Sequence, residues 1–232
     1  MHIPDGFINA GVSAAAGAAS AAGVGVSLVK AKATMDEKQA PLAGLVAAYV
    51  FAVQMLNFPV AAGTSGHLLG GVLAAVLVGP WAGCIVIALV LMVQALMFSD
   101  GGMSALGLNV LNMAIIGTWG GYLVFLVIRW ILPRNRPSLV AAASLAAFTS
   151  VILAAMGFVV EYALGGAGDA PIGTVLAAMG GVHLLIGVGE AVITGLTISA
   201  VVAVRPDVVY GAKDLMPALE IHSPSVKGGE PS

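Results

Sequence analysis

Long apolar segments dominate this chain of 232 residues and restrict what it can fold into. Glycines, prolines and charged residues divide the sequence into seven such segments. They cover residues 9–30, 41–59, 67–79, 81–98, 104–131, 138–163 and 174–204. Only 9% of the residues are charged, against about 25% in a soluble domain, so a water-soluble surface cannot be built. Because unpaired backbone groups are costly in lipid, the sequence predicts an all-α, polytopic membrane protein with seven transmembrane helices.

The positions of the charged residues predict the orientation of the chain. If the amino terminus lies outside and successive segments alternate, all nine Lys and Arg residues fall on the inner side. Asp5, Asp100, Glu161 and Asp169 then lie toward the outer side. Positive charge is enriched on the cytoplasmic side of membrane proteins. We therefore expect a protein of the inner (cytoplasmic) membrane, with its amino terminus outside and its carboxyl terminus in the cytoplasm.

The third segment is shorter than the others and follows an unusual loop. A helix over residues 67–79 would not span the roughly 30 Å hydrocarbon core. We expect a crossing helix that begins below the outer surface, after a non-helical loop over residues 59–66. Non-helical backbone at membrane depth is tolerated where it is buried in protein or lines a cavity, and it commonly marks a binding site. Thr64 and Ser65 in this loop, and His67 where it meets the helix, are therefore candidate site residues.

The two ends of the chain lead to separate expectations. No Lys or Arg precedes the first apolar segment, so no cleavable signal peptide is predicted and Met1 is expected to be the mature terminus. A bulky residue such as His2 should also block removal of the initiator methionine. Toward its carboxyl end the chain becomes polar and rich in Pro and Gly. We expect residues 1–206 to form the transmembrane domain, which holds any functional site, and residues 207–232 a disordered cytoplasmic tail.

His2 suggests a metal site at the start of the chain. A free amino group, the His2 backbone nitrogen and the His2 Nδ1 atom can chelate one ion through fused rings, and His67 is the best candidate for the open fourth position. Four nitrogen atoms in a tetragonal arrangement suit Ni²⁺ or Cu²⁺ better than Zn²⁺ or Mg²⁺. Because protons compete for these nitrogen atoms, binding should weaken on acidification. From the residues alone the alternative stays open: residues 1–8 would be a frayed end and His67 an ordinary histidine at a helix start.

Further polar residues lie within or beside the apolar segments. His183 and Glu190 share one face of the last segment, and ionisable residues inside a membrane are candidates for function. They could support the metal ligands, contact the ion in transit, or form hydrogen bonds with other helices. Asn57, Asn109 and Asn112 could hold the amino-terminal loop, with plain hydrogen bonding between helices as the competing interpretation.

Motifs of several other functions are absent from the sequence. It has no phosphate-binding glycine loop with its lysine, no His-Glu-x-x-His zinc motif and no defensible Ser/His/Asp arrangement, so an enzyme is not expected. The lone Cys84 gives no cysteine-rich metal cluster, and basic patches for nucleic acid are absent. Two functions are then the main candidates for a membrane protein with such a metal site. One is a subunit that captures the ion and delivers it with partner proteins, and the alternative is a stand-alone secondary carrier or channel for divalent metals. A carrier of this kind would need a relay of acidic residues across several helices, but only Glu190 lies well inside a segment. An intramembrane hydrolase ranks last.

Five stretches resemble the CbiM/NikM family. The first is Met-His-Ile-Pro-Asp-Gly-Phe at the start of the chain. The others are Asn-Phe-Pro-Val-Ala-Ala-Gly-Thr-Ser-Gly-His-Leu-Leu-Gly-Gly (57–71), Leu-Val-Gly-Pro-Trp-Ala-Gly (77–83), Asp-Gly-Gly-Met-Ser-Ala-Leu-Gly-Leu-Asn (100–109) and Gly-Val-His-Leu-Leu-Ile-Gly-Val-Gly-Glu (181–190). Together these motifs are highly specific and span nearly the whole membrane part.

The resemblance implies the substrate-binding component of an energy-coupling-factor transporter for Ni²⁺ or Co²⁺, the latter supplying cobalamin biosynthesis. It implies seven helices with the amino terminus inserted in the bundle, and metal ligands from the Met1 amino group, the His2 backbone and side chain, and His67. The implied partners are a transmembrane coupling protein, two cytoplasmic ATPase subunits and a small two-helix membrane protein. The Pro-Asp-Gly start and the Gly-Thr-Ser-Gly-His run look more like the nickel branch.

Overall fold

The computed structural model describes residues 1–35, 39–59 and 65–215, and within these ranges the regular structure is almost entirely helical. The membrane-type helices are α1 (Ala10–Thr34), α2 (Gln39–Gln54), α3 (Gly71–Val78), α4 (Pro80–Phe98), α5 (Leu106–Asn109) continued by the π-helix η1 (Val110–Gly120) and by α6 (Gly121–Ile131), α7 (Arg136–Gly165) and α8 (Ile172–Val204). One pair of two-residue strands, β1 (Phe58–Pro59) and β2 (Ser65–Gly66), runs antiparallel between α2 and α3. Thr64 lies outside the described residues.

Five helices of the described chain are long and apolar enough to cross a membrane. They are α1, α4, the continuous helix from Leu106 to Ile131, α7 and α8. Each of the seven segments predicted from the sequence contains a helix, but α2 has 16 residues and α3 only eight. Seven crossings therefore stay a prediction, while the all-helical membrane fold is confirmed.

Two predicted helix boundaries were wrong, and local chemistry explains both. The second helix ends at Gln54 and not at residue 59, because the chain enters the strand β1, whose second residue is Pro59, and proline is unsuited to a helix interior. The third helix begins at Gly71 and not at residue 67. Gly70 adopts a left-handed conformation with φ of 73°, which a helix does not continue through.

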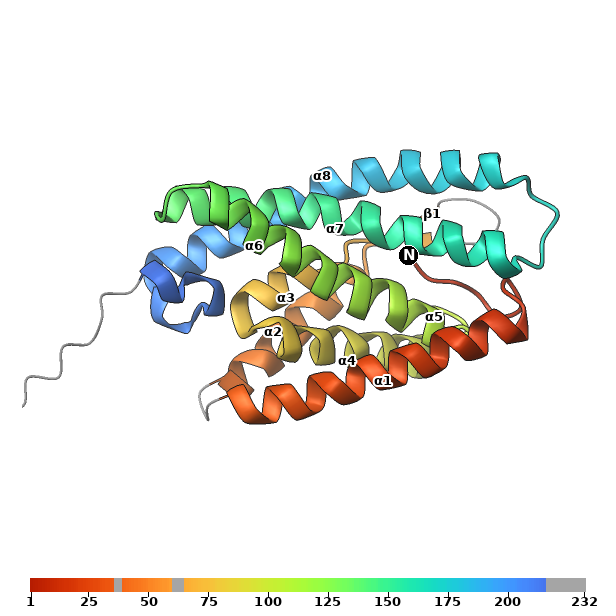
Figure 1. The fold of residues 1–232 in the computed structure, drawn as a ribbon, viewed down its shortest axis with the longest axis horizontal. Helices are drawn as coiled ribbons and strands as arrows, with labels where there is room; N and C mark the ends of the chain where they lie inside the picture. The colour runs from red at the N-terminus through yellow and green to blue at the C-terminus, as the bar shows by residue number, and fades with distance from the viewer. Residues whose placement is uncertain (36–38, 60–64, 216–232) are drawn as a thin grey trace, which may run out of the picture.

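The short helix α3 lies at the centre of the bundle. All eight of its residues are buried, and it contacts α2, α4, α6, α7, α8 and η1. Figure 1 shows it surrounded by the longer helices. Since the ends of α3 meet protein, the helix does not have to match the thickness of the hydrocarbon core.

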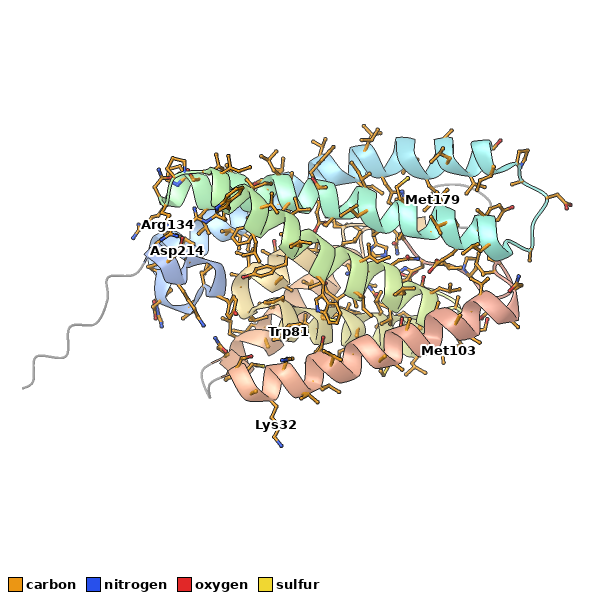
Figure 2. The ribbon with its side chains drawn as sticks, viewed as in Figure 1. Lys32, Trp81, Met103, Arg134, Met179 and Asp214 are labelled. Carbon is orange, nitrogen blue, oxygen red and sulfur yellow. The ribbon has the colours of Figure 1, made fainter. Side chains whose placement is uncertain are left out.

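Seven basic residues of the described chain gather toward one end of the molecule. They lie at or just beyond the ends of α1, α6 and α8, at the start of α7, and in η3. These residues are Lys30, Lys32, Arg129, Arg134, Arg136, Arg205 and Lys213. Figure 2 shows Lys32, Arg134 and Asp214 toward the left of the bundle, and Met103 and Met179 toward the right. The folded chain thus has the charge asymmetry that the sequence predicts.

The carboxyl-terminal boundary differs from the expected one at residue 206. Two 3₁₀-helices follow α8, η2 (Pro206–Val208) and η3 (Tyr210–Leu215). Val209 and Ala212 are buried, and Arg129 of α6 pairs with Asp214. The folded part therefore reaches Leu215, since burial of these apolar side chains holds the segment against the bundle. Residues 216–232 lie outside the described residues.

Candidate metal centre

The first nine residues form a loop that returns into the bundle. Figure 1 shows the N-terminus among the helices, from where the loop runs outward to the start of α1. The Asn9 amide donates to the Gly165 carbonyl at 2.7 Å, and the Ala167 amide donates to the Phe7 carbonyl at 3.0 Å. The Asn9 side chain also caps α1 by accepting from the Val12 amide. These bonds fix the outer part of the loop to the end of α7.

The inner part of the loop is bonded to the segment between α4 and α5. The Ile3 amide donates to Asn109 Oδ1 at 2.8 Å, and the Ile3 carbonyl accepts from the Gly102 amide at 2.8 Å. Asp5 Oδ1 accepts from the amide and the hydroxyl of Ser104, at 2.7 and 2.6 Å. A Cβ at position 102 would collide with the Asp5 backbone, so glycine permits this close approach. Asn109 thus holds the amino-terminal loop, as one of the two interpretations of the sequence has it.

Met1 and His2 consequently reach the interior beside His67. The three residues are 1%, 4% and 0% exposed, and the centroids of the two imidazole rings are 4.5 Å apart. Burial lowers the pKa of the Met1 amino group to about 4, although Asp100 and Glu190 act in the opposite direction. At neutral pH the amine is therefore uncharged, which is the form that binds a metal ion.

One hydrogen bond sets the orientation of the His67 ring. Its Nδ1 lies 2.7 Å from the carbonyl oxygen of Leu68, and because a carbonyl oxygen only accepts, Nδ1 must carry the proton. Nε2 then holds the lone pair, and it is buried without a hydrogen-bond partner. Histidines that bind metals commonly donate their other ring nitrogen to a carbonyl or a carboxylate in this way. Nε2 of His67 is therefore available as a ligand.

Side chains from two helices hold the backbone that follows His67. Glu190 on α8 accepts from the Leu69 amide through Oε2 at 2.8 Å and from the Gly70 amide through Oε1 at 2.7 Å. Gln54 at the end of α2 donates to the Leu69 carbonyl at 2.6 Å. Buried backbone groups without partners would be costly, so these contacts stabilise the non-helical loop. Glu190 thus bonds to the backbone two and three residues after His67.

Asp100, in the turn after α4, contacts the His2 ring. Its Oδ1 lies 2.9 Å from His2 Nδ1, but the angles are not those of a hydrogen bond, so we treat the contact as electrostatic. Its Oδ2 accepts from Asn57 Nδ2 at 3.0 Å. Asn57 therefore supports Asp100.

A cavity of about 330 Å³ lies beside this contact. Its lining comes from the amino-terminal loop and from the turn after α4, and consists of His2, Pro4, Asp5, Ser99, Asp100, Gly101 and Gly102. Asp5 is exposed, so the cavity connects the surface with the buried His2 ring.

His183 also lies near the proposed ligands. It is fully buried and interacts electrostatically with His67 and with the Met1 amine; its Nδ1 lies 2.8 Å from the Met179 carbonyl of its own helix, and its Nε2 has no partner. Ser65 lies in β2, two residues before His67. Asn112 donates to Glu161 at 2.6 Å, which is the plain bond between helices and not a contact with the amino-terminal loop.

Three residues at this site were not predicted from the sequence. Gln54 and Gln94 are fully buried, and Gln94 faces His2; glutamine inside an apolar segment was the available signal. Asp100 was assigned only to the outer side. The sequence offered no spacing rule that would pair it with a residue near the start of the chain.

Side chains alone do not make a conventional metal site here. Among the described residues, no three His, Cys, Asp or Glu side chains are grouped so that they could share a metal ion. The main-chain donors of residues 1 and 2 would have to complete the set. With Nδ1 of His2 and Nε2 of His67 they supply four nitrogen donors, a set that suits Ni²⁺, Co²⁺ or Cu²⁺ and not Mg²⁺ or Ca²⁺.

Comparison with known proteins identifies the family. A family model described as CbiM, cobalt uptake substrate-specific transmembrane region, matches residues 2–208. The chain belongs to the CbiM family. The match spans both histidines of the candidate centre and reaches into η2.

Relatives of this CbiM-family chain are named for nickel and for cobalt. A protein of Archaeoglobus fulgidus, named as a fused nickel transport protein NikMN, is 40% identical over 209 residues, which are 90% of this chain and 68% of the relative. The cobalt transport protein CbiM of Sorangium cellulosum is 33% identical over 219 residues, covering 90% and 94%. A crystal structure of a truncated transition metal transporter superposes with a TM-score of 0.79 at 32% identity, covering 88% of this chain and 99% of that one. The chain is thus a membrane protein of a nickel and cobalt transport family.

Proposed function

We propose that this chain is the substrate-capture membrane subunit of an ATP-driven energy-coupling-factor transporter that imports Ni²⁺ or Co²⁺. One observation carries the proposal: the buried Met1 amine, His2 and His67 lie together inside the bundle. The Met1 amine, the His2 backbone nitrogen, His2 Nδ1 and His67 Nε2 would hold the ion as substrate. Glu190 raises the pKa of the amine, and its negative charge favours a dication in a buried site.

Nickel is the proposed substrate ahead of cobalt. Both metals accept nitrogen ligands, but Ni²⁺ stands above Co²⁺ in the general order of affinity. Deprotonation of a backbone amide also requires a metal that forms strong in-plane bonds. The nickel-named relative is the more similar of the two compared above. For cobalt as substrate, the imported ion would supply cobalamin biosynthesis.

The proposal assigns ATP hydrolysis and coupling to partner proteins. The 232 residues contain no phosphate-binding loop. The proposal therefore includes a transmembrane coupling protein, two cytoplasmic ATPase subunits and a small two-helix accessory membrane protein. Nucleic acid plays no part in it.

The proposed topology places the metal centre toward the outside of the cytoplasmic membrane. The basic residues gather at the end of the bundle opposite the α7–α8 turn, to which the amino-terminal loop is bonded. By the positive-inside rule that basic end faces the cytoplasm. Seven helices would cross the bilayer, with α3 shielded by its neighbours.

Moving the amine by one residue tests the proposal. A chain with one glycine placed before Met1 keeps every side chain but removes the fused chelate rings. Wild-type protein should bind one Ni²⁺ in a calorimetric titration. Loss of a residue that only supports a metal ligand lowers metal affinity about 10- to 100-fold. The extended chain loses a ligand itself, so its Ni²⁺ affinity should fall by more than that. A control chain carries the same glycine after Arg134, in the exposed α6–α7 turn at the other end of the bundle, and should bind like the wild type.

Two results would contradict the proposal. Equal Ni²⁺ affinity of the extended and wild-type chains would exclude the amine as a ligand, and wild-type protein that binds neither Ni²⁺ nor Co²⁺ would exclude metal capture. Metal flux into proteoliposomes that contain this chain alone would favour a stand-alone carrier.

A further inference from the structure

Asp100 occupies a position between the cavity and the proposed metal ligands. The cavity is lined by both Asp100 and His2, and His2 is nearly fully buried with Nε2 unpartnered. Asp100 is half-buried. An ion from the surface that passes through this cavity therefore meets the Asp100 carboxylate next to the first imidazole.

The backbone and one neighbour hold the Asp100 carboxylate toward His2. The Asp100 amide donates to the Gln94 carbonyl at 3.1 Å, at the end of α4, and Asn57 donates to Oδ2 at 3.0 Å. Oδ1 then remains for the contact of 2.9 Å with His2 Nδ1.

That contact places a carboxylate oxygen beside the atom through which the proposed chelate must close. The fused rings that begin at the amine can close only through Nδ1 of His2, because Nε2 lies on the far side of the ring. The contact of 2.9 Å does not occupy the bonding direction of Nδ1, because its angles are not those of a hydrogen bond. An ion held by Oδ1, which is itself a ligand for divalent ions, is therefore within reach of Nδ1.

We propose that Asp100 is a relay ligand: its carboxylate takes the cation from the cavity and passes it to His2 Nδ1. The inference rests on the proposed function, since it assumes that Met1, His2 and His67 form the final site. The incoming ion first binds Oδ1, and Nδ1, which lies 2.9 Å from that oxygen, then replaces Oδ1 in the coordination shell. The ion moves inward because four nitrogen ligands bind Ni²⁺ or Co²⁺ better than one carboxylate does.

A relay ligand has a kinetic signature that a final ligand or a structural residue lacks. Asp100 acts on the path in both directions and is absent from the end state. Its removal should slow association and dissociation together and leave the equilibrium constant nearly unchanged. Loss of a final ligand, in contrast, would raise Kd chiefly through faster dissociation.

Asp5 provides the matched control. Its carboxylate lines the same cavity and accepts from Ser104 through Oδ1, an acceptor that asparagine keeps, so the amino-terminal loop stays anchored in Asp5→Asn. Asp5→Asn and Asp100→Asn therefore remove the same charge from the same cavity. General attraction of cations by surface carboxylates is screened by salt, whereas a step that requires direct contact is not.

The experiment measures Ni²⁺ association and dissociation by stopped flow with the full chain, at low and high ionic strength. Asp100→Asn should slow both rates about tenfold, with Kd changed less than threefold, and the defect should persist at high salt. Asp100→Glu should restore most of the rates. Asp5→Asn should have a smaller effect that salt abolishes. Thermal unfolding of each variant shows that it is folded.

Three outcomes would overturn the relay. Equal, salt-sensitive slowing of both asparagine variants would reduce Asp100 to general attraction of cations. A Kd raised 100-fold with faster dissociation would make it a final ligand. Unchanged rates would remove it from the path. In each case wild-type binding and its loss in the extended chain would leave the proposed function standing, whereas wild-type protein without Ni²⁺ binding would end both proposals.

Discussion

Replacing Glu190 by glutamine tests whether the non-helical loop presents His67. Both oxygens of Glu190 accept backbone amides, those of Leu69 and Gly70, at 2.8 and 2.7 Å. Glutamine keeps one oxygen and turns an NH₂ group toward the other amide, so one bond is lost and one buried N–H is left without a partner. The residue does not touch the proposed ligand nitrogen atoms, so its effect passes through the loop and through its charge, which also acts on the Met1 amine.

The structure sets the size of the effect. A hydrogen bond to a charged group contributes about 1.5–3 kcal/mol, and the remaining bond to a neutral oxygen loses roughly half of that strength. The loop should therefore lose about 2–4 kcal/mol. If this free energy appears fully as a smaller population of the binding-competent loop, apparent Ni²⁺ affinity falls by about 30- to 700-fold. We expect at least a tenfold loss.

Calorimetric titration of Ni²⁺ into purified Glu190→Gln protein measures the change. Glu161→Gln is the control, because Glu161 is also a buried carboxylate but is bonded to Asn112 between η1 and α7. Its affinity should remain within threefold of wild type. Wild-type affinity in a folded Glu190→Gln variant would refute the account of the loop.

Two further predictions follow from the amine and from the left-handed turn. Because the pKa of the Met1 amine lies at about 4, that group is already deprotonated at pH 7.5 and protonates only as the pH approaches 4. Titrations in buffers of different ionisation enthalpy should show about one proton released per Ni²⁺, from the His2 backbone amide, whereas an amine with its usual pKa near 8 would bring the number close to two. Gly70→Ala should lower thermal stability and Ni²⁺ affinity together, because φ is 73° and the new Cβ would lie 2.9 Å from Val50. Gly173→Ala, with open space at its Cβ, should be neutral or slightly stabilising; equal behaviour of the two variants would contradict this reading of the turn.

The sequence predicted the helical segments well because lipid imposes one strong rule on the backbone. Apolar length located all seven segments, and charge asymmetry agreed with the folded arrangement. The rule fails inside the bundle, where protein replaces lipid. The start of α3 shifted from residue 67 to Gly71 because Gln54 and Glu190 satisfy the backbone that a helix would otherwise satisfy. The π-helix over 110–120 left no signal in the spacing of apolar residues.

The proposed ligands of the candidate site could be predicted from the sequence, but the contacts between residues far apart in the chain could not. His2 next to a free amine defines a chelate by covalent geometry alone, and His67 stood out on an unusual loop. The contact of Asp100 with His2, in contrast, depends on how the α4–α5 turn approaches the amino-terminal loop. That approach needs Gly102 against Asp5 and the bonds of Asn109 to Ile3, which no local pattern reveals.

X-ray absorption spectroscopy of the Ni²⁺-loaded protein tests the central claim most directly. The account predicts four nitrogen neighbours in a planar arrangement, with scattering from two imidazole rings, and loss of one imidazole in His67→Ala. A six-coordinate shell dominated by oxygen, or a nitrogen shell that survives both His67→Ala and the added amino-terminal glycine, would contradict it.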